Sequence, residues 1–215
     1  MKKIIAGLAV VAIIIIIVSF KKHTPAPSVN AAGFTPVSVI ELFTSQGCSS
    51  CPSADHLLEK TIIDAKKDGR KIFALSFHVD YWNRLGWKDP FSEQKYSQRQ
   101  NEYASLLHLN SVYTPQMIVN GRQEFVGSDE NNLTQALHKS LNTTPLADFK
   151  ILKATVQNGV PQVEYTIEGN TNGSKINFAL VSLSETTNIK RGENAGITLT
   201  NDNVVRQFLS IPAQA

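Results

Sequence analysis

The sequence predicts an α/β fold built around a strand–helix–strand unit. Three observations support this fold class: an apolar, β-branched run at residues 37–43, a helical spacing of apolar residues at 51–67, and a second apolar run at 71–79. A helix of this length between two such strands is typical of a βαβ unit, whose strands are parallel and whose crossover is right-handed. We therefore expect residues 36–145 to form an α/β domain.

The helix expected at residues 51–67 is the best-marked element. Pro52 stands near its start, where the missing proline N–H leaves no helical hydrogen bond unmade. Asp68-Gly69-Arg70 ends it. Between these signals the helix has one apolar face, which carries Leu57, Leu58, Ile62, Ile63 and Ala65.

Shorter elements follow along the chain. Residues 80–92 are aromatic and rich in turn-forming residues, which indicates an ordered loop, and residues 93–109 are expected to be helical. A strand at 116–120, the turn signal Asn120-Gly121 and a return strand at 123–126 predict a hairpin. An amphipathic helix is expected at 129–141.

The composition changes at Thr144-Pro145. Apolar or alternating runs at 151–156, 162–167 and 176–183 are separated by the turn signals Asn158-Gly159 and Asn172-Gly173. Antiparallel strands joined by tight turns produce this pattern. We expect residues 146–215 to form a small C-terminal antiparallel β module packed on the α/β domain.

Positive charge is concentrated at the N-terminal end of the chain. The 215 residues carry a formal net charge of +3, but Lys2, Lys3, Lys21 and Lys22 all flank one apolar segment. Without these four, 17 of the 21 Lys and Arg residues remain against 18 Asp and Glu. Nucleic-acid binding needs clustered positive charge, so the body of the chain is not expected to bind nucleic acid.

The N-terminal segment predicts export. Residues 4–20 form an apolar run that would span about 25 Å as a helix, close to the thickness of a bilayer core, and Lys2 and Lys3 precede it. Residues 1–23 are expected to be a signal-anchor helix, or a signal peptide cleaved near Ala31, and residues 24–35 a linker. The folded part would then lie in the periplasm or on the extracytoplasmic face, anchored or released.

The only two cysteines, Cys48 and Cys51, form a C-x-x-C motif at the start of the 51–67 helix. Unpaired N–H groups and the positive end of the helix dipole stabilise a thiolate there, and the thiolate is the nucleophile of disulfide exchange. The motif therefore favours a redox-active, thioredoxin-like site without a cofactor. Cys48 would attack, and Cys51, one turn further along and more buried, would resolve the mixed disulfide.

Other uses of the cysteine pair stay open. A structural disulfide would close a very short loop and contribute only about 2 kcal/mol. A structural zinc site would need four ligands, and the sequence has no second C-x-x-C. A copper-type metal site would combine Cys48 and Cys51 with His78, although His78 is also well placed to be a hydrogen-bonded structural histidine.

Further candidate site residues lie along the chain. Thr114-Pro115 enters the 116–120 strand, the position at which a cis proline faces the dithiol in thioredoxin folds and the residue before it presents its backbone to substrate. Glu41, in an otherwise apolar strand, would be a buried proton relay, or would face solvent or an arginine. Trp82 and Trp87 would form a recognition surface beside the dithiol, or serve in packing.

Four segments of the chain resemble one family. They are residues 39–52 (VIELFTSQGCSSCP), 78–92 (HVDYWNRLGWKDPFS), 113–121 (YTPQMIVNG) and 191–196 (RGENAG), and the resemblance extends over residues 37–205. The family is that of bacterial, thioredoxin-like secreted proteins catalogued as domain of unknown function 1223. The resemblance implies a thioredoxin-like domain with a C-terminal β extension and export in a bacterium, and it implies no particular substrate.

The resemblance also bears on the end of the chain. Family members continue beyond the RGEN region, so the last strand of the β module is expected to be short or differently completed. The segment from Arg191 to Asn194 is expected to dock the β module against the loop at residues 78–89.

The leading hypothesis is a membrane-tethered, extracytoplasmic thiol–disulfide oxidoreductase. Its partners would be protein or small thiol and disulfide substrates, and the membrane through residues 4–20. Alternatives are a non-catalytic binding module that uses the β module for recognition, and a copper-type metallochaperone that uses the cysteines with His78. Ser49 and Ser50 carry neither charge nor ring, so the motif does not indicate the direction of exchange.

Overall fold

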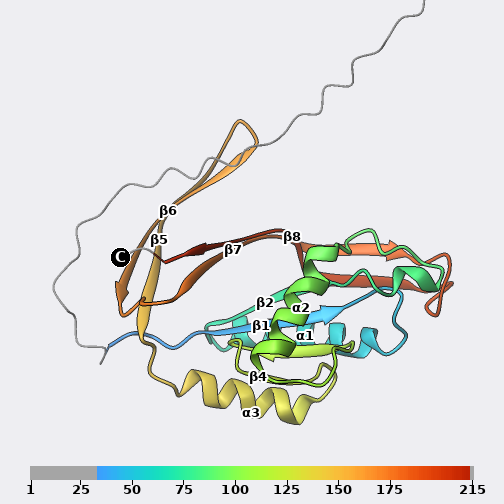
Figure 1. Cartoon of the computed structure of the whole chain (residues 1–215), viewed down its shortest axis with the longest axis horizontal. Coiled ribbons are helices and arrows are strands. Elements are labelled where there is room, and N and C mark those ends of the chain that lie inside the picture. Colours follow the sequence, from blue (N-terminus) through green and yellow to red (C-terminus); the bar gives the residue numbers. More distant parts are fainter. Residues whose placement is uncertain (1–32, 214–215) are drawn as a thin grey trace, which may run out of the picture.

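The computed structural model describes residues 33–213, which form a mixed six-stranded sheet with helices on both faces and a separate two-stranded hairpin (Figure 1). The chain order is β1 (Ser38–Thr44), α1 (Cys51–Lys67), β2 (Ile72–His78), the short 3-10 helix η1 (Asn83–Leu85), α2 (Gln94–Leu106), β3 (Gln116–Val119), β4 (Gln123–Val126), α3 (Glu130–Leu141), β5 (Ala147–Gln157), β6 (Val160–Gly169), β7 (Lys175–Asn188) and β8 (Thr198–Pro212). The predicted α/β class is confirmed, and α2 ends three residues before the predicted boundary.

The large sheet has the strand order β4-β3-β1-β2-β8-β7. Strands β1 and β2 are parallel, as the strand–helix–strand pattern predicted, and Thr44 stands opposite His78 at their carboxyl ends. The β3–β4 hairpin adds to β1 in antiparallel orientation. The predicted cysteine helix α1 connects β1 to β2 and therefore begins at the same edge of the sheet.

Helices α1 and α3 cover one face of the sheet. Alternate residues of a strand point to opposite faces, so Ile40 and Leu42 of β1 meet Leu58 of α1 and Leu133 of α3 in one core cluster. The intervening side chains face α2 on the other side, where the buried residues are Phe43, Phe77, Val79, Tyr96, Ile118 and Val205. The helices thus hold the sheet between two apolar layers and fix the position of the loops at its edge.

The C-terminal region differs from the predicted single antiparallel module. Only β5 and β6 form a small sheet of their own, whereas β7 and β8 belong to the large sheet. Strand β8, for which the sequence predicted no residue range, runs parallel to β2 with Val204 opposite Ser76, and Ser76 Oγ donates to the carbonyl of Asp202 at 2.6 Å. The last strand is 15 residues long rather than short, and its Val204 and Val205 are buried.

The β5–β6 hairpin projects away from the large sheet (Figure 1). Cross-strand partners share a face, so Phe149 with Ile167 and Ile151 with Tyr165 make one face apolar. Tyr165 packs on Phe178 of β7, with ring centroids 5.7 Å apart. This aromatic contact ties the hairpin to the large sheet.

No helix among residues 33–213 is long and apolar enough to cross a membrane. The apolar run at 4–20, the cleavage position at Ala31 and most of the predicted linker lie outside the described residues.

Candidate functional site

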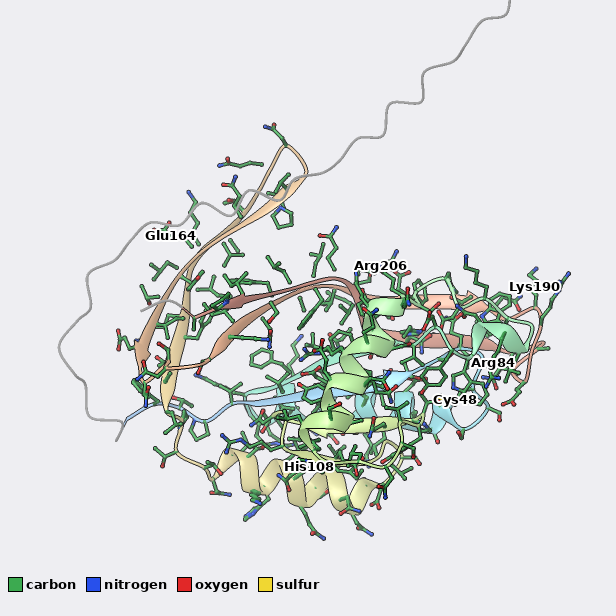
Figure 2. All side chains as sticks on the ribbon, in the orientation of Figure 1. Cys48, Arg84, His108, Glu164, Lys190 and Arg206 are labelled. Carbon is green, nitrogen blue, oxygen red and sulfur yellow. A yellow bond between two sulfur atoms is a disulfide. The ribbon has the colours of Figure 1, made fainter. Side chains whose placement is uncertain are left out.

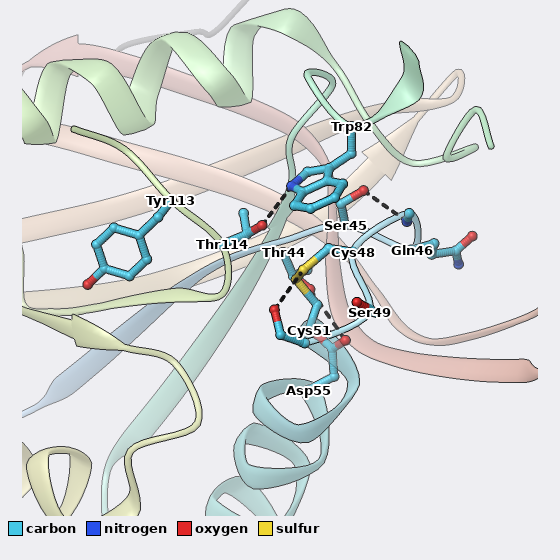
Figure 3. Close-up of a disulfide and its surroundings, with 12 residues drawn as sticks. Thr44, Ser45, Gln46, Cys48, Ser49, Cys51, Asp55, Trp82, Tyr113 and Thr114 are labelled. Atoms are coloured by element: carbon cyan, nitrogen blue, oxygen red, sulfur yellow. Dashed lines mark hydrogen bonds between the residues drawn. A yellow bond between two sulfur atoms is a disulfide. The ribbon is translucent and has the colours of Figure 1, made fainter. Parts of the chain in front are cut away.

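The cysteine pair forms a disulfide at the start of α1. Cys48 lies in the loop after β1, Cys51 is the first residue of α1, and their Cα atoms are 5.4 Å apart (Figure 3). Both residues are fully buried, so the predicted difference in exposure between them is absent. The hydroxyl of Ser50 lies 3.4 Å from Cys48 Sγ. This edge of the sheet therefore holds a covered disulfide at a helix N-terminus.

The bond between Thr114 and Pro115 is cis, as predicted. Pro115 is buried close to the cysteine helix. Gly127 lies in the narrow space between Pro115 and Ala54 of α1, where a Cβ on Gly127 would stand 3.0 Å from the Pro115 Cβ and 3.1 Å from the Ala54 Cβ. Thr114 is partly exposed, and its hydroxyl accepts a hydrogen bond from Trp82 Nε1 at 2.7 Å. Proline and disulfide thus lie on adjoining elements.

Trp82 lies over the cysteine loop. Figure 3 shows its indole beside the disulfide with its nitrogen directed at Thr114. A Cβ at Gly47, the residue before Cys48, would stand 3.4 Å from the Trp82 Cβ, which shows how closely the loop and the tryptophan approach. Trp82 therefore connects the cysteine loop to the residue before the cis proline.

Asp55 is the carboxylate on the cysteine side of the sheet. It lies one helical turn after Cys51, is half-buried, and accepts a hydrogen bond from the Thr44 hydroxyl at 3.3 Å. Burial raises the pKa of Asp55 from 3.8 to about 7, against the opposing effects of His78 and of the Thr44 hydrogen bond. A carboxyl with this pKa exchanges protons near neutrality.

A buried polar network supports the cysteine loop from behind. Asp89 accepts three hydrogen bonds: from His78 Nδ1 at 2.7 Å, from the Gln46 N–H at 2.8 Å and from the Phe91 N–H at 2.9 Å. Burial opposes ionisation of Asp89, but His78 and these hydrogen bonds outweigh it and hold its pKa below the ordinary value. Asp89 is therefore an anion that fixes the backbone two residues before Cys48.

The side chain of Gln46 extends this network. It donates from Nε2 to Asn201 of β8 at 3.0 Å and accepts from Trp87 Nε1 at 3.2 Å. Because the Asp89 carboxylate can only accept, His78 Nδ1 carries the shared proton. Two buried nitrogens at this network have no hydrogen-bond partner among the described residues, His78 Nε2 and Asn201 Nδ2. His78 is thus the structural histidine that the sequence favoured, paired with Asp89.

The turn between β7 and β8 (residues 189–197, the β7–β8 turn) reaches the cysteine loop. Asn194 Nδ2 donates to the carbonyls of Gln46 and Cys48, both at 2.9 Å, and Glu193 Oε2 accepts from the Ser49 N–H at 3.1 Å. A Cβ at Gly192 would stand 3.2 Å from Trp87 Cβ, so the turn also packs on the 78–89 loop. The docking predicted for the RGEN segment is confirmed, and it includes the cysteine motif.

Glu41 does not lie with this site. It faces α2, on the sheet face opposite α1, where Arg99 Nε and Nη2 donate to its two oxygens at 2.6 and 2.7 Å and the Tyr103 hydroxyl donates at 2.6 Å. Arg99 and Tyr103 both lie on that face. Glu41 therefore faces an arginine, which is one of the alternatives that the sequence left open. The proton relay predicted at Glu41 is therefore corrected, since Asp55 and not Glu41 lies beside the cysteines.

The described residues contain no group of three or more His, Cys, Asp and Glu side chains arranged to hold a metal ion. Cys48 and Cys51 are bonded to each other, and His78 uses Nδ1 for Asp89. This arrangement gives the copper-type hypothesis no support.

Sequence reasoning missed Asp55, Gln46 and Asn201. A signal existed for Asp55, because the spacing of four from Cys51 places both residues on one helix face. No local signal existed for Gln46 and Asn201, which are 155 residues apart in the chain.

Comparison with solved structures finds two similar chains. Protein AGR_C_4864 from Agrobacterium tumefaciens is 30% identical, with a TM-score of 0.63 over 84% of this chain and 75% of that one. HBP35 of Porphyromonas gingivalis is 18% identical, with a TM-score of 0.55 over 82% of this chain and 57% of that one, and shows likeness of fold alone. No curated protein matches the chain.

The family comparison agrees with the segments identified in the sequence. The model of one family matches residues 39–215, a range that contains the cysteine motif, the cis proline and the β7–β8 turn. The chain therefore belongs to the family described as protein of unknown function DUF1223.

Proposed function

We propose that this chain is a thiol–disulfide oxidoreductase with a thioredoxin-like core. The observation that carries the proposal is the C-x-x-C disulfide at the N-terminus of α1, with the cis Thr114-Pro115 bond directly before β3. A helix N-terminus stabilises the thiolate that exchange requires. The strand order β4-β3-β1-β2, in which β3 alone runs opposite to the other three strands, also supports the proposed core.

The proposed exchange has two steps. In the reduced protein the Cys48 thiolate attacks one sulfur of a substrate disulfide; a Cys48–substrate disulfide forms, and the other substrate sulfur leaves as a thiolate. Cys51 then gives its proton to Asp55 and attacks the Cys48 sulfur. The Cys48–Cys51 disulfide forms and the second substrate sulfur leaves, so two electrons pass from the dithiol to the substrate, and the reverse sequence oxidises a substrate dithiol.

Substrate access requires movement around Cys48, because Cys48 is buried. The partly exposed Trp82 and Thr114 lie beside the disulfide. A substrate chain that pairs with the backbone of Thr114 would displace the Trp82 indole from the Thr114 hydroxyl. Trp82 and Thr114 are the proposed substrate-binding residues on this basis, whereas Trp87 positions Gln46.

The proposal also includes an extracytoplasmic location. The apolar run at 4–20 with its preceding lysines predicts export, with the chain anchored or released. Exported dithiols meet oxidising conditions and disulfide-containing partners, which suits exchange chemistry.

The test is exchange by single cysteine variants. We expect the wild type to catalyse thiol-dependent reduction of a disulfide substrate, C48A to lose that activity, and C51A to accumulate a mixed disulfide that non-reducing electrophoresis detects. Absence of exchange in both directions by folded wild-type protein would overturn the proposal and leave the binding module as the function.

A further inference from the structure

The β7–β8 turn brings a carboxylate to the N-terminus of the cysteine helix. The first turn of α1 contains no acidic residue of its own. Glu193 supplies the negative charge from a position 144 residues further along the chain, where its Oε2 accepts the Ser49 N–H. Hydrogen bonds from the Ser49 side chain and backbone lower the pKa of Glu193, so it is ionised at neutral pH.

The position of this carboxylate is fixed although the group itself is exposed. Its neighbour Asn194 is buried and bound to the carbonyls of Gln46 and Cys48, and Gly192 is packed against Trp87. Gly192 has φ +78°, which favours glycine there. Glu193 is therefore held beside the cysteine loop from both sides.

The charge of Glu193 opposes the formation of a second anion, the Cys48 thiolate, in the same loop. Reduction of the disulfide allows Cys48 to form a thiolate at the N-terminus of α1, next to Ser49. A negative charge close by disfavours ionisation of a second group, and the Glu193 carboxylate is bound to the N–H of Ser49, the residue that directly follows Cys48. The disulfide form has no sulfur anion and does not meet this repulsion.

We propose that Glu193 is a positioning residue that tunes the redox pair, disfavouring the Cys48 thiolate and making the reduced pair a stronger electron donor. This rests on the proposed function and deepens it, because it assigns a bias to the direction of exchange. Stabilising the thiolate of a reduced pair makes its disulfide a stronger oxidant, and Glu193 does the reverse.

The other titratable groups around the cysteine loop come from several elements. They are Asp55 of α1, His78 of β2, Asp89 of the following loop, Asp202 of β8, and Lys190 and Arg191 of the β7–β8 turn. All of them are unchanged in a Glu193 variant. A comparison of Glu193→Gln with wild type therefore isolates one charge.

The experiment titrates the reduced full-length chain by the ultraviolet absorbance of its thiolate, from about pH 5 to about pH 10. We expect E193Q to form the Cys48 thiolate at a pH lower by about one unit, and E193D, which keeps the charge, to retain most of the wild-type behaviour. The control is E164Q, which removes the same charge from the exposed β6 strand, far from Cys48 (Figure 2).

Equilibration with glutathione gives a second readout. The Glu193 charge raises the energy of the Cys48 thiolate and not that of the neutral thiol. E193Q and wild type should therefore have the same oxidised-to-reduced ratio at low pH. At high pH the ratio of reduced to oxidised protein should be up to about tenfold higher in E193Q than in wild type. For this two-electron couple that corresponds to a reduction potential higher by about 30 mV. A change in packing alone would not follow the thiol titration.

The outcomes separate this inference from the proposed function. Thiolate titrations of folded E193Q and wild type that coincide would overturn the role of Glu193 and leave exchange intact. A titration in E193Q that moves to higher pH would also overturn it. A pair that dithiothreitol fails to reduce in either protein would instead overturn the proposed function, and the inference with it.

Discussion

Glu41 and Asp55 are two carboxylates on either side of one sheet, and their surroundings assign them different roles. Glu41 receives two hydrogen bonds from Arg99 and one from Tyr103, so it is satisfied as an anion. Asp55 receives one long hydrogen bond from Thr44, and burial raises its pKa to about 7. In the proposed exchange, Asp55 is the carboxyl placed to take and return the Cys51 proton.

Replacement of Asp55 should slow the resolving step. In D55N no carboxylate takes the Cys51 proton, and we expect turnover near neutral pH to fall by about 100-fold, with the difference shrinking at higher pH as Cys51 ionises unaided. Stopped-flow exchange across pH measures this. Asp64→Asn on the exposed face of the same helix is the control, and equal rates for D55N and D64N would contradict the role of Asp55.

The same residue should give stability a particular pH dependence. Asp55 has a pKa of about 7 in the folded protein against 3.8 ordinarily, so the folded state holds a proton that the unfolded chain releases. The free energy of unfolding should therefore fall as pH rises from about 4 to about 7. D55N should lack this fall in the free energy of unfolding. Urea unfolding at several pH values would then show D55N becoming more stable relative to wild type as pH rises from about 4 to about 7.

The ion pair on the opposite face should matter for stability alone. E41Q leaves the nearly buried Arg99 guanidinium without its anion, and we expect it to lower the free energy of unfolding by roughly 3 kcal/mol. E130Q breaks the exposed pair with Lys60 and should cost less than about 1 kcal/mol. Urea unfolding compares the two, and a thiolate titration changed by E41Q would argue against this separation of roles.

At the scale of elements, the β7–β8 turn fixes the cysteine loop through Asn194. N194A removes the donor to two carbonyls at a buried position, and we expect it to cost about 1–3 kcal/mol and to speed alkylation of reduced Cys48. Asn188→Ala, at the exposed end of β7, is the matched control. Alkylation of N194A at the wild-type rate would show that the turn does not restrict the loop.

The sequence predicted the elements whose signals are local and gave no bounds for β8. Helix α1 has Pro52 at its start and one apolar face, and its bounds are those predicted. Strand β8 mixes polar and apolar residues without a regular alternation, and it becomes a strand by pairing with β7 and β2. Its placement depends on a contact between residues 76 and 204, which no local pattern encodes.

The candidate site divides in the same way. The cysteine motif and the proline were found because each is a contiguous signal. Docking of the segment from Arg191 to Asn194 on the 78–89 loop came from the family resemblance. The hydrogen bonds of Asp89 and Asn194 to the backbone of the cysteine loop were not predicted, since side-chain hydrogen bonds between distant segments depend on the finished fold.

At the scale of the whole molecule, the last strand belongs to the core whereas the hairpin does not. Val205 lies in one core cluster with Phe77, and Phe208 packs on Phe77 with ring centroids 5.4 Å apart. The β5–β6 hairpin is closed at its base by the Asn170 N–H, which donates to the Leu146 carbonyl at 2.9 Å. The two ends of the hairpin therefore lie side by side where it joins the rest of the protein.

Two deletions should separate these parts. A chain of residues 33–145 lacks β8, and we expect it to show no cooperative unfolding, because the aromatic cluster around Phe77 is left open. A chain that joins residue 146 directly to residue 170 should unfold cooperatively and keep the wild-type thiolate titration. Circular dichroism against urea measures both, and cooperative unfolding of residues 33–145 would contradict the core role of β8.

The hydrogen bond between Asn194 and the Cys48 carbonyl joins residues 146 positions apart, and this separation has a consequence for biosynthesis. The ribosome makes the cysteines early and the β7–β8 turn late, so a growing chain carries Cys48 and Cys51 for most of its synthesis without the segment that later holds their loop. The cysteine loop can therefore reach its final arrangement only after residue 194 has been made.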